Sequence, residues 1–214
     1  MKLGRAAILS VSASVFIAAL PPPSPDNTQK AIAILNRTKT TAATYALYSW
    51  NKITPVDKLS FEEWSAEFND GPLHRVETPR DRVVANCVER SGFYYSPTTG
   101  KTFSGPAVAG SACGINTDKP IISIRYIGRV VDPGGAADRV EVVDADNIRT
   151  YDVTSDGILI RTIYALNSAK KPIVLDVETA AIIRALPQQD IFDAASLRLS
   201  VVPDEYKKPI AQPE

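Results

Sequence analysis

The sequence predicts an α+β protein in which an antiparallel meander is covered on one face by an N-terminal helix and, if the segment before Pro187 is helical, by a second short helix. Three observations predict this class. One segment near the N-terminus has helical spacing, and many short segments after it alternate between apolar and polar residues. Short turns rich in Gly, Asp and Asn separate these segments, which is typical of strands joined directly to their neighbours.

The first nineteen residues have the pattern of a secretory signal peptide. Lys2 and Arg5 precede an uncharged apolar run, residues 6–20, which is shorter than the ~20 residues of a membrane span. We expect a signal peptide over 1–19, cleaved after Ala19, and a proline-rich linker over 20–26. An uncleaved anchor remains the alternative. No later run approaches spanning length, so we expect no integral membrane span after cleavage.

A single domain is expected over residues 27–203, followed by a frayed tail over 204–214. Its helix is predicted over 27–43, because Asp26 and Gln29 resemble a capping box and apolar residues follow at helical spacing. The expected strands cover 43–53, 60–69, 73–79, 81–89, 93–96, 102–105, 121–131, 139–144, 148–154, 158–166 and 172–177. Residues 177–186 fit either helix or strand, and 194–202 could supply one closing strand.

Both cysteines, Cys87 and Cys113, flank a segment that contains Gly100-Lys101-Thr102. Their wide separation excludes a CxxC redox motif, and the single histidine, His74, makes a four-ligand zinc site untenable. In an exported protein two cysteines most often form a structural disulfide. A phosphate-binding loop would need a glycine where this chain has Tyr95, so we interpret the triplet as a hairpin turn.

Several classes of function are disfavoured. The 24 basic and 24 acidic side chains balance, which argues against a nucleic-acid-binding surface. No nucleophile–base pair, metal motif or cofactor motif is recognisable, so we expect no enzyme, no metal and no cofactor, with a hydrolase only as a third possibility. The aromatic residues fill a core or line a cavity for an apolar ligand, and both uses call for the same residue types. The candidate ligand-binding residues are Trp50, Trp64, Phe93, Tyr95, Tyr126, Ile160 and Tyr164.

Residues 61–115, and more loosely the chain to residue 166, resemble the LolA/LolB-type lipoprotein carriers and the related MucB/RseB-type domains. The resemblance rests on "HRVETPRDRVVANCVERSGFYYSPTTGKTF", in which Phe93, Tyr95 and Pro97 match an aromatic strand and the turn after it. It implies a curved half-barrel whose concave face, lidded by helices, holds acyl chains or an apolar partner. It also implies a periplasmic location in a Gram-negative envelope, whereas the signal peptide alone implies only export.

Two hypotheses follow. The first is a periplasmic, non-catalytic half-barrel that binds a lipid or the acyl chain of a lipoprotein in its concave face. The second is an envelope protein–protein interaction module with a solid core and no ligand.

Overall fold

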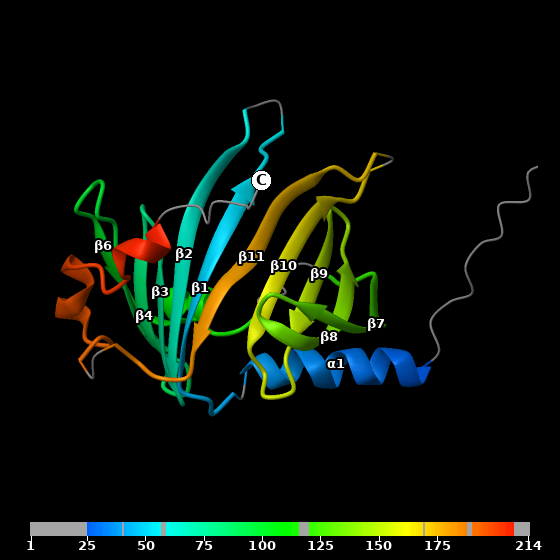
Figure 1. The fold of residues 1–214 in the computed structure, drawn as a ribbon, viewed down its shortest axis with the longest axis horizontal. Coiled ribbons are helices and arrows are strands. Elements are labelled where there is room, and N and C mark those ends of the chain that lie inside the picture. The colour runs from blue at the N-terminus through cyan, green and yellow to red at the C-terminus, as the bar shows by residue number, and fades with distance from the viewer. Residues whose placement is uncertain are drawn as a thin grey trace, which may run out of the picture.

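The computed structural model describes residues 25–39, 41–56, 59–115, 120–168, 170–187 and 190–207 of the chain (Figure 1). The expected signal peptide and most of the linker lie outside the described residues, so cleavage after Ala19 stays a prediction. No helix of the described ranges has the length and apolar character needed to cross a membrane.

The structure confirms the predicted fold class, because one sheet of eleven antiparallel strands curves without closing and carries two α-helices (Figure 1). The strands are β1 (Tyr45–Ile53), β2 (Phe61–Asp70), β3 (Leu73–Glu77), β4 (Arg82–Asn86), β5 (Ser91–Tyr95), β6 (Thr102–Ser104), β7 (Ser123–Asp132), β8 (Gly135–Val143), β9 (Asn147–Val153), β10 (Leu159–Leu166) and β11 (Ile173–Ile183). The helices are α1 (Pro25–Lys39), α2 (Pro106–Ala112) and the 3₁₀ turns η1 (Ala194–Arg198) and η2 (Asp204–Lys207).

The sheet consists of two meanders joined at their first and last strands. Its order is β6-β5-β4-β3-β2-β1-β11-β10-β9-β8-β7, so β1 pairs with β11 and the edges are β6 and β7. The first meander runs outward from β1 to β6, and the second returns from β7 to β11. The open question about residues 177–186 is thereby resolved, because β11 continues to Ile183 as one long strand against β1.

Helix α1 ends four residues earlier than predicted. Its buried residues Ala31, Ile34 and Leu35 pack on β7, β8 and β9, which it crosses at the lower right of Figure 1. Beyond Lys39 the Thr41 hydroxyl donates to the Asp156 carbonyl at 2.8 Å, in the turn between β9 and β10. This contact draws the chain away from the helix axis and into β1.

Helix α2 is the element that sequence patterning did not specify. Its seven residues, PAVAGSA, are too few to show helical periodicity, and only small side chains, Ala109 and Ala112, are buried. Pro106 begins the helix, where its missing N–H costs nothing. The helix packs closely on β4 and β5, with Ala85 among its buried contacts.

The expected closing strand over 194–202 was wrong. Residues 190–207, which we call the C-terminal strap, contain η1 and η2 and lie across β2, β4 and β5. The strap's carbonyls bond to buried Arg75 instead of a neighbouring strand; the carbonyl of Leu199 accepts from Arg75 at 2.9 Å. Residues 204–207, predicted to belong to a frayed tail, form η2, and Tyr206 stacks on Tyr48 with ring centroids 4.0 Å apart. Residues 208–214 lie outside the described residues.

Candidate functional site

Alternation along the strands places the helices and the strap on opposite faces of the sheet. Successive strand side chains point to opposite faces. Ala46 and Tyr48 belong to a cluster with the strap residues Ile191 and Val202, whereas Tyr45 points towards α1 and α2. We call the two sides the helix face and the strap face.

The seven sequence-predicted site residues are divided between these faces. Trp50 and Trp64 lie opposite each other on β1 and β2, and Trp64 packs against the cluster under the strap. Phe93 and Tyr95 line an apolar groove of about 290 Å³ beside η1. The remaining three are Tyr126 and Tyr164, which pack against the core beneath α1, and Ile160, which is fully buried in a neighbouring cluster. The seven residues therefore do not line one cavity, and ligand binding by them stays a prediction.

The space beneath α1 is filled by side chains. The helix residues Ala31, Ile34 and Leu35 contact a continuous apolar cluster that includes Val140 and Tyr151, both almost fully buried. The free space found beside α1 in the described chain is a depression of about 130 Å³ lined mainly by isoleucine and leucine. This is below the roughly 300–1,000 Å³ of usual small-molecule sites.

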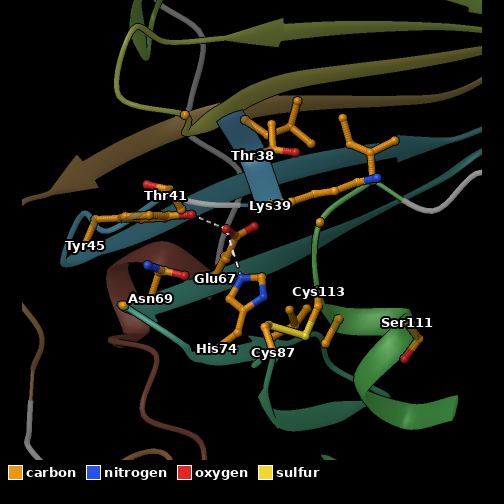
Figure 2. A pocket seen from close by; sticks show the side chains of 17 residues that line it. Thr38, Lys39, Thr41, Tyr45, Glu67, Asn69, His74, Cys87, Ser111 and Cys113 are labelled. Atoms are coloured by element: carbon orange, nitrogen blue, oxygen red, sulfur yellow. Dashed lines mark hydrogen bonds and ion pairs between the residues drawn. A yellow bond between two sulfur atoms is a disulfide. The ribbon is translucent and has the colours of Figure 1, made fainter. Parts of the chain in front are cut away.

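A cavity of about 200 Å³ with a mixed polar and apolar lining lies on the helix face, where the end of α1, the disulfide and α2 approach β1, β2 and β3 (Figure 2). The Cys87–Cys113 disulfide, with Cα atoms 5.5 Å apart, forms one wall and confirms the predicted pairing. We call this space the central cavity. Figure 2 shows that the Tyr45, Glu67 and His74 side chains converge on its floor.

The Glu67 carboxylate links these three side chains through one hydrogen bond and one ion pair. The Tyr45 hydroxyl donates to Glu67 Oε1, and His74 Nε2 lies 3.0 Å from the same oxygen. The Tyr45 and His74 side chains are buried, but 25% of the Glu67 side chain stays accessible. Nearby, the Asn69 amide donates to the Ala43 carbonyl at 2.7 Å, which holds the start of β1 against β2.

The electrostatics of the pair favour a charged histidine and a charged carboxylate. Burial opposes the cationic form of His74, but the Glu67 carboxylate and its hydrogen bond outweigh burial and raise the His74 pKa. Burial likewise opposes the anionic form of Glu67, yet His74 and the Tyr45 hydroxyl lower the Glu67 pKa overall. Burial, reinforced by the Glu67 charge, raises the Tyr45 pKa, so this phenol stays protonated and acts as a donor.

Sequence reasoning did not group these residues, although one signal for them was present. The Asp70-Gly71 turn joins β2 to β3 and sets their register, so that Asn69 pairs with His74. With that register, alternation brings Glu67, two residues before Asn69, to the same face as His74. Tyr45 could not be added from sequence, because its position depends on the β1–β2 pairing.

Two further spaces adjoin the central cavity. One of about 410 Å³ shares Lys39, Ile115 and the disulfide with it. The other, about 130 Å³, shares Glu67 and is lined by hydroxyl residues such as Ser49 and Ser65. The helix face therefore offers a run of small, partly polar spaces instead of one dry chamber. Among the residues described, no group of three or more His, Cys, Asp or Glu side chains is arranged to hold a metal ion.

Comparison with known proteins supports the resemblance at the level of the fold. No family model matches the chain, and a search of curated proteins finds no match. Among solved structures, an uncharacterised conserved protein of Thermus thermophilus aligns with a TM-score of 0.51 and 17% identity, over 84% of this chain and 98% of that one. MucB of Pseudomonas aeruginosa, solved with MucA, aligns with a TM-score of 0.51 and 12% identity, over 81% of this chain.

This chain spans 64% of the MucB chain, so it corresponds to part of that protein. A LolA superfamily protein of Nitrosomonas europaea is a more distant match, with a TM-score of 0.40 and 9% identity over 76% of this chain and 97% of its own length. At these identities the likeness concerns the fold alone. The chain is thus similar in fold to MucB and to the Thermus thermophilus protein.

Proposed function

We propose that this chain is an exported, non-catalytic protein of the periplasm that binds another envelope protein through the helix face of its half-barrel. One observation carries the proposal. The apolar space beneath α1 is filled by core side chains, whereas the free space beside it has polar and ionised groups on its floor. Such a surface suits a partner that supplies polar contacts of its own.

An acyl chain is a poor occupant of the central cavity. Glu67 and His74 form an ion pair there, with Asn69 beside them. An acyl chain would remove water from the accessible part of Glu67 without providing a hydrogen bond, which is costly for an ionised group. At about 200 Å³ the cavity is also below the usual range for a ligand of that size.

The fold comparison agrees with this proposal without deciding it. MucB, which has the same fold, was solved in complex with the protein MucA. The expected signal peptide would bring the present chain to the compartment where envelope partners are met.

Cross-linking in the cells that produce the protein tests the proposal. The tagged chain is cross-linked in intact cells, purified under denaturing conditions and analysed for attached proteins. We expect one envelope protein in a near-equal amount. A cross-linked sample containing only the chain itself, from a fraction in which the chain is abundant and folded, would reject a protein-binding role.

A second candidate, binding of an apolar ligand, is favoured by one place on the strap face. The groove between Phe93, Tyr95 and the η1 residue Leu197 has almost entirely apolar walls, and 48% of Phe93 is exposed. Displacement of a fluorescent fatty acid by natural lipids measures this activity directly. If this groove is the site, Phe93→Ala should weaken binding several-fold, and the exposed Phe103→Ala on β6 serves as its control.

A further inference from the structure

The largest of the spaces next to the central cavity has an unusual combination of walls. It measures about 410 Å³ and lies between the end of α1, the disulfide and α2. Among the residues that the structure describes, its lining consists of Lys39, Cys87, Arg90, Ala109, Gly110, Cys113 and Ile115. Two of these are cationic, none is acidic, and the remainder are apolar or small. We call this space the basic cavity.

Neither cation is neutralised by a neighbour within the part of the chain that the structure describes. Lys39 is exposed at the last residue of α1, and Arg90 is exposed in the turn between β4 and β5. Neither of them takes part in an ion pair with a described carboxylate, whereas Arg37, two residues before Lys39 in the last turn of α1, is paired with Asp138 at 2.7 Å. Two unpaired cations at one cavity form a site where an anionic group is stabilised.

The position of Lys39 is set by close packing. A Cβ atom added at Gly114 would lie 3.0 Å from Lys39 Cγ, so the lysine stem rests on the backbone just after Cys113. Figure 2 shows this side chain extending from the end of α1 towards the segment that follows Cys113. The disulfide holds that segment to the end of β4, close to Arg90. The disulfide therefore joins the segment on which the Lys39 stem rests to the turn that carries Arg90.

The lining is partly polar and partly apolar, and its apolar part adds a second requirement for the ligand. Ala109 and Ile115 are buried hydrophobic residues, and Gly110 leaves open space where a side chain would stand. A ligand that fills the cavity must therefore present a small or medium apolar group next to its anionic group. An acidic segment of a protein, in which Asp or Glu alternates with apolar residues, has this chemistry.

A phospholipid would meet the charge requirement but not the space requirement. Its headgroup could contact Lys39 and Arg90, but its acyl chains would have to continue into a neighbouring space. The adjoining central cavity contains Glu67 and His74 on its floor, which an acyl chain would leave without water. We propose that the basic cavity binds an acidic, apolar-containing peptide segment of the partner protein. This inference rests on the proposed protein-binding function and names the surface that performs it.

Peptide binding to the purified mature chain tests the inference. The probe is a pool of blocked heptapeptides with Glu or Asp at three alternate positions and Leu, Val, Phe or Trp between them. The control pool carries Gln and Asn at the same positions. We expect the acidic pool to shift the amide resonances of Ala109, Gly110 and Ile115, and the neutral pool to shift them far less.

Matched variants separate this site from general charge attraction. Lys39→Gln and Arg90→Gln should each weaken binding about threefold, and the double variant about tenfold, as expected for solvent-accessible ionic contacts. The exposed control changes Lys101→Gln and Arg129→Gln, away from the cavity, should leave affinity within experimental error. Circular dichroism confirms that all variants are folded.

Three results would overturn the inference. In the first, the acidic pool shifts no resonance at the cavity; in the second, it binds equally well to the double variant. Alternatively, vesicles of phosphatidylethanolamine and phosphatidylglycerol could shift the cavity resonances while the peptides do not, which would assign the site to lipid. If cells still yield a protein partner whose binding ignores Lys39 and Arg90, the proposed function stands and only this surface is wrong.

Discussion

At the scale of single residues, the Arg75–Glu77 pair is the most completely buried charged feature of the described chain. Both side chains have no exposed surface, and Arg75 Nε donates to Glu77 Oε1 at 2.7 Å. Arg75 also donates to strap carbonyls, and Glu77 accepts from the Ser200 hydroxyl at 2.7 Å. The pair therefore joins β3 to the strap, because it supplies the hydrogen bonds that an extra strand would otherwise provide.

Replacing Arg75 should destabilise the fold strongly. Arg75→Ala leaves buried Glu77 with only the more distant guanidinium of Arg82, 3.6 Å away, as an ionic partner and removes the donors to the strap, which costs about 3–5 kcal/mol for pairs of this kind. Urea unfolding monitored by tryptophan fluorescence measures the loss.

The matched control for that change is Arg80→Ala. Arg80 pairs with Glu63 at 2.8 Å, but 52% of its side chain is exposed. We expect a cost of no more than about 1 kcal/mol. Equal losses for Arg75→Ala and Arg80→Ala would show that the buried pair does not anchor the strap.

The His74–Glu67 pair should make stability depend on pH in a defined direction. Because the His74 pKa is raised above 6.5 on folding, its contribution is complete below pH 6.5 and is lost as pH rises through the folded value. Because the Glu67 pKa is lowered from 4.5, its contribution is present above pH 4.5 and is lost as pH falls through the folded value. The pair therefore stabilises most between these limits.

The single histidine makes this prediction directly measurable. Its ring resonance should titrate above pH 6.5. The Tm advantage of the natural protein over His74→Gln should shrink as the pH is raised through the folded pKa of His74. A ring resonance that titrates below pH 6.5 would contradict the pairing with Glu67.

At the scale of elements, α2 depends on two devices that compensate for its shortness. The disulfide joins its C-terminal end to the residue after β4 across a sequence separation of 26. Gly92 in β5 provides the second device, because an added Cβ would lie 2.7 Å from the Ala109 backbone nitrogen. This seven-residue helix, whose buried side chains are alanines, therefore stays on the sheet because the disulfide ties its end to β4 and because Gly92 lets β5 approach its backbone closely.

Removing the disulfide should lower the free energy of unfolding by about 3–4 kcal/mol, since the cross-link reduces the conformational entropy of the unfolded chain. The Cys87→Ala/Cys113→Ala double variant is compared with the oxidised chain by urea unfolding. We also expect protease cleavage to begin within residues 106–115. Unchanged stability, or cleavage starting elsewhere, would show that the link does not hold α2.

Two glycines, Gly92 at the contact between β5 and α2 and Gly110 on the exposed side of α2, should respond in opposite ways to alanine. Gly92→Ala forces α2 away from β5 and should destabilise by about 1–3 kcal/mol, as overpacking does. Gly110→Ala, inside α2 with open space around it, should be neutral or stabilise by about 0.5–1 kcal/mol. Thermal unfolding of both variants measures the difference. A comparable effect for the two would argue against the close approach of α2 and β5.

At the scale of the whole molecule, local sequence patterns predicted the strands far better than the contacts between segments that are distant in the chain. Turn chemistry such as Asp70-Gly71 marked the hairpins of the meander, because adjacent antiparallel strands depend on local sequence. The strap could not be predicted in the same way. Its conformation depends on Arg75, more than a hundred residues earlier in the chain, and no local pattern records such a contact.

The candidate site was harder to predict for a related reason. A β-bulge between Tyr126 and Gly128, and another between Leu159 and Arg161, interrupt the alternation from which shared faces were inferred. The aromatic residues also serve both faces, so residue type alone could not show that Trp64 and Tyr126 lie on opposite sides. The cavity on the helix face is distinguished by the polar side chains Tyr45, Glu67 and His74, which come from three separate strands.

Native mass spectrometry of the mature chain, isolated gently from the cells that produce it, tests the central claim most directly. The account predicts a mass equal to the chain alone or to the chain with one protein partner, and no lipid that stays bound after mild activation. A stoichiometric lipid or lipoprotein acyl chain that survives purification, and that Phe93→Ala does not release, would place an apolar ligand on the helix face and contradict the account.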